Sequence, residues 1–127
     1  MNEDVKTQFV NALMSGEYPQ IKGRLHDEFG GVCANGLLCE LAIQNGLNVQ
    51  RVIGGYAVDR GTWTQYSGDF GPPTAVMNWA GIDEKWSQFL ARLNDTGYTF
   101  QEIGEQLKHD SSTSALFRAI CAPKGEK

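Results

Sequence analysis

The spacing of apolar residues predicts a helix near the middle of the chain. In residues 31–47, GVCANGLLCELAIQNGL, the side chains of Leu37, Leu38 and Leu41 fall on one face of a helix with 3.6 residues per turn. An Asn-Gly pair follows, and such a pair supplies the left-handed stop at a helix end. We therefore expect a central buried helix against which hairpins and later helices pack.

Apolar residues recur with helical spacing in five more segments. The strongest match is Trp86, Phe89, Leu90 and Leu93, at positions i, i+3, i+4 and i+7, after a cap at Asp83. The other four segments are residues 3–15, the segment after Pro72-Pro73, the segment begun by the capping-box pair Thr99 and Glu102, and a short helix around Leu116 capped by Asp110 or Ser112.

Strand-forming residues lie between the central helix and these later helices. Residues 49–59 read as one strand, in which Gly54-Gly55 marks a bulge or a close neighbour, and residues 62–66 read as the returning strand. A weak hairpin is also predicted near Ile21 and Leu25. Helices combined with antiparallel hairpins predict an α+β fold, with one domain over residues 1–123 and a frayed tail at 124–127.

Composition and charge exclude some classes of function. The net charge is −4, and a duplex DNA binder needs a cationic face to replace counterions. The first residues lack the pattern of a secretion signal, and no apolar run approaches the roughly 18 residues of a membrane span. Three cysteines without framework spacing suit reduced thiols. We expect a protein of the cytoplasm, without a membrane or duplex DNA as partner.

The cysteines and histidines are the candidate reactive groups. Cys33 and Cys39 are six residues apart, whereas structural zinc sites favour pairs spaced by two to four residues. We therefore expect buried free thiols, no metal and no cofactor. A thiol nucleophile is the sharper alternative, because a turn could bring His26 to Cys33.

The hairpin is the candidate binding surface. Tyr56, Trp63 and Tyr66 lie close to Arg60 and Asp69, and aromatic planes with an arginine can stack a base and hold a phosphate. The alternative is that Tyr56 and Trp63 simply cover the central helix, as large residues on a hairpin face often do.

A polar turn follows the strongest helix. Asn94, Asp95 and Thr96, followed by glycine, have the residue types that support a turn through their side chains. The functional interpretation is a polar rim that exchanges hydrogen bonds with a ligand. The sequence leaves both interpretations open.

Two segments resemble a family of small phage and prophage proteins. Residues 23–46 contain Cys-x-x-Gly-x-Leu-Cys-x-Leu-Ala, and residues 90–107 contain Leu-Asn-Asp-x-Gly-x-Thr-Phe-x-Glu-Ile. The family has no established activity, so the resemblance implies a phage or prophage source. The chain departs from the pattern at Asn35, where an apolar residue is common, and a buried amide there needs hydrogen-bond partners.

Together these features predict a small phage accessory protein that acts in the host cytoplasm by non-covalent binding, as a homodimer and not as an enzyme. One mode is counter-defence by sequestering a nucleotide signal of host immunity between the hairpin and the turn at Asn94. Alternatives are occlusion of a host defence protein by direct contact, a small thiol hydrolase that uses Cys33 with His26, and an assembly factor.

Overall fold

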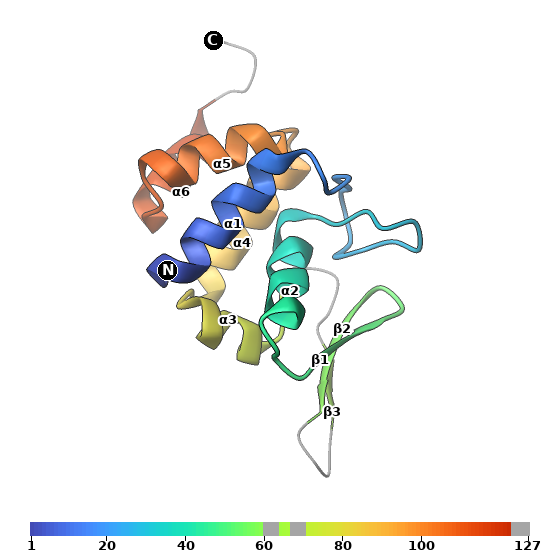
Figure 1. Cartoon of the computed structure of the whole chain (residues 1–127). Coiled ribbons are helices and arrows are strands. Elements are labelled where there is room, and N and C mark those ends of the chain that lie inside the picture. Colours follow the sequence, from blue (N-terminus) through green and yellow to red (C-terminus); the bar gives the residue numbers. More distant parts are fainter. Residues whose placement is uncertain (60–63, 67–70, 123–127) are drawn as a thin grey trace.

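The α+β fold predicted from the sequence is confirmed. The structure is a computed structural model that describes residues 1–59, 64–66 and 71–122, and these residues form six helices and a three-stranded sheet (Figure 1). The elements are α1 (Glu3–Ser15), α2 (Ala34–Gln44), β1 (Val49–Val52), β2 (Gly55–Asp59), β3 (Thr64–Tyr66), α3 (Thr74–Ala80), α4 (Glu84–Asp95), α5 (Phe100–His109) and α6 (Thr113–Cys121).

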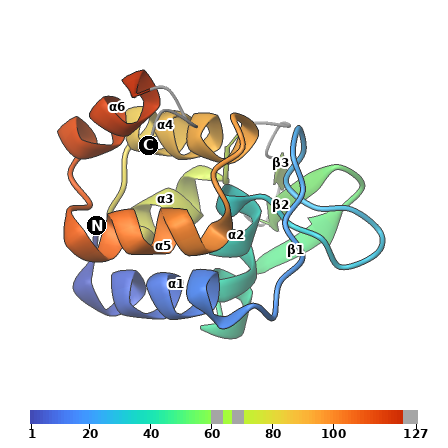
Figure 2. The ribbon, with the colours of Figure 1, turned by 90° about the horizontal axis from the view of Figure 1, so that it is seen from above.

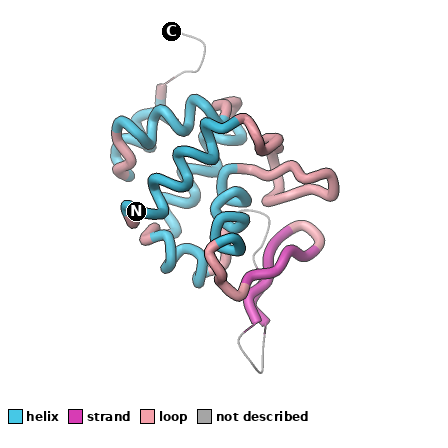
Figure 3. The backbone as a smooth tube through the Cα atoms, viewed as in Figure 1, coloured by secondary structure: helices cyan, strands magenta, loops and turns pink. Residues whose placement is uncertain are grey.

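The helices gather on one side of the molecule and the sheet lies on the other (Figure 3). The helix α2 lies between them and contacts α1, α3, α4 and β1. Every residue from Ala34 to Ala42 is buried, so the predicted central helix is confirmed. Figure 2 shows α1 alongside α5, and α6 packs on α4.

Local capping signals explain where the helices begin. The side chains of Asn2, Asp83 and Ser112 each accept a hydrogen bond from a backbone N–H in the first turn of the helix that follows. Thr99 and Glu102 form the predicted capping box at the start of α5. These caps are confirmed because each depends on residues only two or three positions apart.

The strand region differs from the prediction. Residues 49–59 are two antiparallel strands, in which Val52 pairs with Gly55, and the turn between them falls at Ile53-Gly54. Gly54 has φ of +77°, which glycine adopts readily in a tight turn. The chain therefore reverses at Ile53-Gly54, and the prediction of a single strand with a bulge is wrong.

The hairpin predicted near Ile21 and Leu25 is wrong as well. In the described residues this segment forms isolated bridges only, in which Gln20 and His26 both pair with Val32. The backbone of Leu25 instead lies against the start of α2. A Cβ added at Gly36 would meet the Leu25 carbonyl oxygen at 1.9 Å, so the contact requires glycine.

Asn35 is completely buried and has partners in α4. Its Nδ2 donates to the backbone oxygen of Ser87 at 3.0 Å, and its Oδ1 accepts from the Ser87 hydroxyl at 3.3 Å. The amide that departs from the apolar pattern thus links the start of the central helix to a neighbouring helix.

Candidate functional site

Tyr56 lies in the core. Its side chain is 0% exposed, and its hydroxyl donates to Glu40 Oε2 at 2.7 Å and approaches the Gly36 oxygen at 3.3 Å. Burial and the hydrogen bond to Glu40 raise the pKa of Tyr56 far above its usual value. The expectation that this ring stacks on a ligand is corrected: the alternative, that Tyr56 covers α2, holds.

The other predicted hairpin residues are only partly placed. Arg60, Trp63 and Asp69 lie outside the described residues. The backbone of Tyr66 lies in β3 opposite Ala57.

Asn94 is buried, and its side chain bonds to three residues outside its own helix. It is fully buried, its Oδ1 accepts from Gln20 Nε2 at 2.9 Å and from Ala34 N at 3.2 Å, and its Nδ2 donates to Ile21 O at 2.8 Å. These bonds join α4 to the chain before α2 and to the first residue of α2. Asn94 therefore cannot serve as a polar rim, and the expected role of this residue in ligand binding is corrected.

The next two residues, Asp95 and Thr96, also bond to backbone groups of the protein. Asp95 Oδ1 accepts from Gly23 N at 3.3 Å, and Thr96 Oγ1 donates to Arg92 O at 2.8 Å. Thr96 acts as the turn interpretation expects, whereas Asn94 and Asp95 also bond to segments far away in the sequence. Tyr56 is engaged elsewhere, because its hydroxyl contacts the middle of α2, so Tyr56 and Asn94, the two buried residues of the predicted set, make separate internal contacts.

An ion pair between buried Glu40 and Arg51, whose side chain is 59% exposed, lies where α2 faces β1. Both carboxylate oxygens of Glu40 are occupied: Oε2 accepts from Arg51 Nε and from the Tyr56 hydroxyl, each at 2.7 Å, and Oε1 accepts from Arg51 Nη2. Burial raises the pKa of Glu40, but the hydrogen bonds from Arg51 and Tyr56 outweigh burial and lower it overall. The Glu40 carboxylate is therefore ionised, and both of its oxygens accept hydrogen bonds from Arg51 or Tyr56.

His26 fastens a surface turn to the β1–β2 hairpin. Its Nε2 lies 2.7 Å from Val52 O and 2.8 Å from Gly55 O, and both of these atoms are acceptors, so Nε2 carries a proton. The ring meets Tyr56 edge-on, with centroids 5.1 Å apart. The segment that follows His26 is therefore held beside the tip of the hairpin.

Asp27 shapes that segment into a turn. Its Oδ1 accepts from Phe29 N at 2.9 Å and from Gly31 N at 2.8 Å. The hydrogen bond from Phe29 and then that from Gly31 lower the pKa of Asp27, so the carboxylate is charged at neutral pH. The turn presents Phe29 at its tip.

Two large apolar side chains stand bare on neighbouring turns. Phe29 is 87% exposed, and Ile53, at the tip of the β1–β2 hairpin, is fully exposed. Figures 1 and 2 show these two turns side by side from two directions. A pocket of about 420 Å³ lies between the turn of Phe29, α2 and β1, and its lining includes Tyr18, Asp27, Glu28, Glu40 and Arg51. We call Phe29, Ile53 and this pocket the turn-tip face.

Sequence reasoning missed both apolar residues, although they share a signal. Phe29 and Ile53 each stand directly before a glycine pair. The first glycine of each pair has a positive φ, +88° at Gly30 and +77° at Gly54. A large apolar residue followed by two glycines is thus a sequence pattern for a side chain raised on a tight turn.

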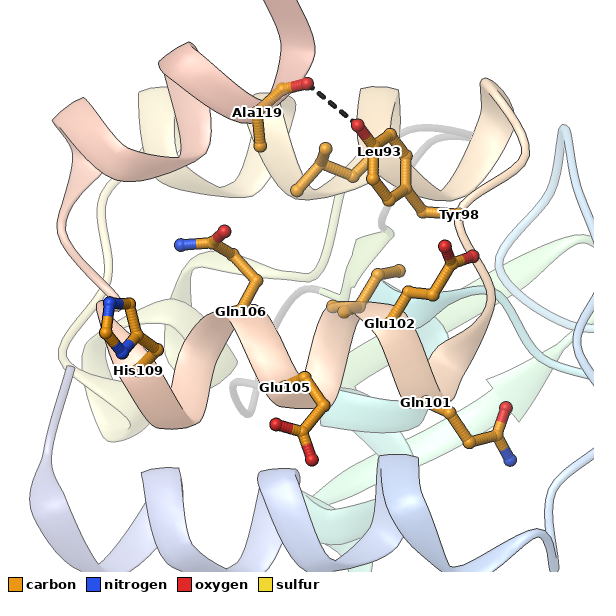
Figure 4. A pocket seen from close by; sticks show the side chains of 9 residues that line it. Leu93, Tyr98, Gln101, Glu102, Glu105, Gln106, His109 and Ala119 are labelled. Carbon is orange, nitrogen blue, oxygen red and sulfur yellow. Dashed lines mark hydrogen bonds between the residues drawn. The ribbon is translucent and has the colours of Figure 1, made fainter. Parts of the chain in front are cut away.

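A second pocket of about 430 Å³ lies between α4, α5 and α6 (Figure 4). Leu93, Tyr98 and Ala119 line it from one side and α5 lines it from the other. Three of its polar groups serve the fold: the Tyr98 hydroxyl donates to Ala119 O at 3.0 Å, Glu102 belongs to the capping box, and Gln106 Nε2 donates to Asp110 O at 3.0 Å.

The thiols have contrasting surroundings. Cys33 caps α2 with its sulfur, and burial raises its pKa, which disfavours the thiolate that a nucleophile needs. Burial raises the pKa of Cys39 further, whereas Cys121 is exposed. His26, the residue expected to activate Cys33, instead directs its Nε2 to the carbonyl oxygens of Val52 and Gly55 in the hairpin. No cluster of three metal-ligating side chains occurs among the described residues.

None of the helices in the described residues is both long and apolar enough to cross a membrane.

No curated protein and no solved structure matches this chain. A family model matches residues 1–111, and that family is described as a domain of unknown function, DUF8296. The match spans α1 to α5, so the chain belongs to the DUF8296 family.

Proposed function

We propose that this chain is a small phage accessory protein that acts by non-covalent binding, and that it covers a host protein through the turn-tip face. The observation that supports this is the exposure of Phe29 and Ile53 on adjacent turns. Contiguous bare apolar groups with a polar surround are typical of protein contact sites.

The turns that carry Phe29 and Ile53 are held by hydrogen bonds within the protein before any partner binds. Asp27 closes the turn that carries Phe29, and His26 ties that turn to the carbonyls of the hairpin that carries Ile53. A surface held in its binding conformation before contact loses less entropy on association. The geometry therefore favours binding over catalysis.

Nucleotide sequestration is a weaker candidate at this face. Arg51 is the arginine that lines the pocket, and its guanidinium is paired with Glu40. Asp27 and Glu28 add two carboxylates to the same lining, and these repel a phosphate. We expect a panel of cyclic and linear nucleotides to leave the melting temperature unchanged, whereas a clear rise would restore sequestration as the leading function.

A plating assay tests the proposed function. Host strains that each carry one defence system would express the wild type or the double variant Phe29→Ser, Ile53→Ser during phage infection. We expect the wild type to raise plating efficiency on at least one strain, and the double variant to lose that effect while remaining folded. The serines remove the apolar contact without disturbing buried atoms.

Phe117→Ser is the matched control, because Phe117 is also an exposed phenylalanine, 51% exposed, but lies on α6. It should keep the effect on plating. Full activity of the double variant would refute the turn-tip face, and absence of any effect of the wild type would refute counter-defence. Cys33→Ala should act like the wild type, and its loss of activity would favour the thiol hydrolase.

A further inference from the structure

We infer that the partner segment covering the turn-tip face carries a basic side chain flanked by apolar residues, and that the basic group enters the pocket beside Phe29. This inference rests on the proposed function and specifies the chemistry of the partner. It follows from which charges in the pocket are already neutralised and which are not.

Two carboxylates in the pocket remain available. Asp27 uses Oδ1 for the N–H groups of Phe29 and Gly31, and its Oδ2 accepts no hydrogen bond from the described residues. Glu28 is exposed and forms no ion pair within them. Both line the pocket and can receive an ammonium or guanidinium group.

The other charged pair contributes little net charge. Arg51 and Glu40 neutralise each other through two hydrogen bonds, and the Tyr56 hydroxyl completes the Glu40 carboxylate. Among the lining residues, Asp27 and Glu28 are therefore the acidic groups in excess, with Arg24 near enough to lower the pKa of Asp27. A partner with an acidic residue here would be repelled, whereas a basic one would be attracted.

The shape of the site suits a lysine or arginine. The pocket volume of about 420 Å³ accommodates such a side chain. The methylene stem of a basic residue packs on apolar surface while its charged head stays among polar groups. Phe29, 87% exposed, lies in sequence between Glu28 and Gly30 of the pocket lining, and its ring offers both an apolar contact for the stem and a face for the cation.

The same charges disfavour a second copy of the chain as occupant. A two-fold interface would place this face against itself, since such interfaces use one patch on both subunits. Asp27 and Glu28 would then approach their own copies in a protein whose net charge is −4. A different protein with a basic segment fits better.

Peptide selection tests the inference. A display library of random dodecapeptides would be panned against the folded wild-type protein, and the binding of enriched peptides would be measured by fluorescence anisotropy. We expect lysine or arginine beside apolar residues in the enriched sequences, and weaker binding at high salt. No enrichment, or enrichment of acidic or uncharged sequences, would overturn the inference.

A charge-removing variant isolates the pocket. Asp27→Asn with Glu28→Gln deletes both charges but keeps an acceptor oxygen for the turn N–H groups. Glu84→Gln with Glu105→Gln deletes two exposed charges on α4 and α5 and is the matched control. We expect the first pair to weaken peptide binding about tenfold and the control pair to leave it unchanged. Equal binding to both would overturn the inference.

The Phe29→Ser, Ile53→Ser variant distinguishes failure of this inference from failure of the proposed function, which is binding through the turn-tip face. Some peptides could lack a basic residue and still bind this variant more weakly than the wild type. That result would refute the inferred basic side chain but would support the turn-tip face as the binding surface. Peptides that bind it as well as the wild type would refute the face itself. A dimer in analytical ultracentrifugation that this variant abolishes would make a second copy the occupant and would also overturn the inference.

Discussion

Tyr56 shows how the role of a residue depends on a neighbour far along the chain. In sequence it stands among strand formers near an arginine, which is compatible with a stacking surface. In the structure its hydroxyl meets Glu40, 16 positions earlier on α2. The sequence contains both residues but nothing that pairs them, because the pairing depends on how β2 packs against the helix.

The Glu40 carboxylate makes stability depend on pH. Its pKa is lowered in the folded protein, so its contribution is fully present above the unfolded pKa and is lost as the pH falls through the folded pKa. We expect Glu40→Gln to reduce the free energy of unfolding at pH 7 by about 1 kcal/mol, because charged hydrogen bonds become neutral. Urea unfolding between pH 3 and 7 would measure it.

Glu40→Gln should also lose less stability than the wild type on acidification below about pH 4, the region of an ordinary carboxyl pKa. Exposed Glu105→Gln is the control and should match the wild type at pH 7. If Glu40→Gln and the wild type had parallel stability curves across this range, the ion pair would not be the source of the acid sensitivity.

Exposure predicts the order in which the thiols react. Cys121 is exposed, whereas Cys33 and Cys39 are buried with raised pKa values. We expect a thiol-specific chromogenic reagent at pH 8 to modify one thiol quickly and the other two only at the rate of unfolding. Cys121→Ser should abolish the fast phase. A fast phase that persisted in this variant would mean that a helix-α2 thiol is reactive.

At the scale of elements, the helices are predicted more accurately than the strands. Every described helix except α3 begins at a side-chain cap whose partner is two or three residues away, so the sequence pattern contains the whole interaction. Gly54 is different, because a glycine with positive φ suits both a bulge and a two-residue turn. The pairing of Val52 with Gly55 decides between them, and that pairing requires the second strand.

The junction of α2, α4 and the preceding loop depends on Asn94. Asn94→Ala would leave Ala34 N and Ile21 O without their bonds to the Asn94 side chain, whereas Gln20 Nε2 would keep its bond to Tyr98 O. Unpaired buried polar groups cost about 1–3 kcal/mol each, so we expect a loss of roughly 2–4 kcal/mol in the free energy of unfolding. Chemical denaturation followed by circular dichroism would measure it.

Thr96→Ala is the control for that junction, since Thr96 is exposed and its hydroxyl bonds only within the end of α4. We expect a change within about 0.5 kcal/mol for the control. Equal stability of the two variants would show that the amide of Asn94 does not hold the junction.

At the scale of the whole molecule, the turn-tip face depends on the tertiary fold. Phe29 and Ile53 are far apart in sequence, and His26 brings their turns together through the carbonyls of Val52 and Gly55. The glycine pairs predict two raised side chains but not their proximity. The charge of the pocket likewise emerges only when Arg51 is seen to be neutralised by Glu40.

Site-specific photo-cross-linking tests the turn-tip face most directly. A photoreactive benzoylphenylalanine would replace Phe29 in one variant and Phe117 in another, in host cells irradiated during phage infection. We predict a discrete protein adduct from position 29 that disappears when Ile53→Ser is added, and none from position 117. Equal adducts from both positions, or no adduct from position 29, would contradict the proposal that this face binds a host protein.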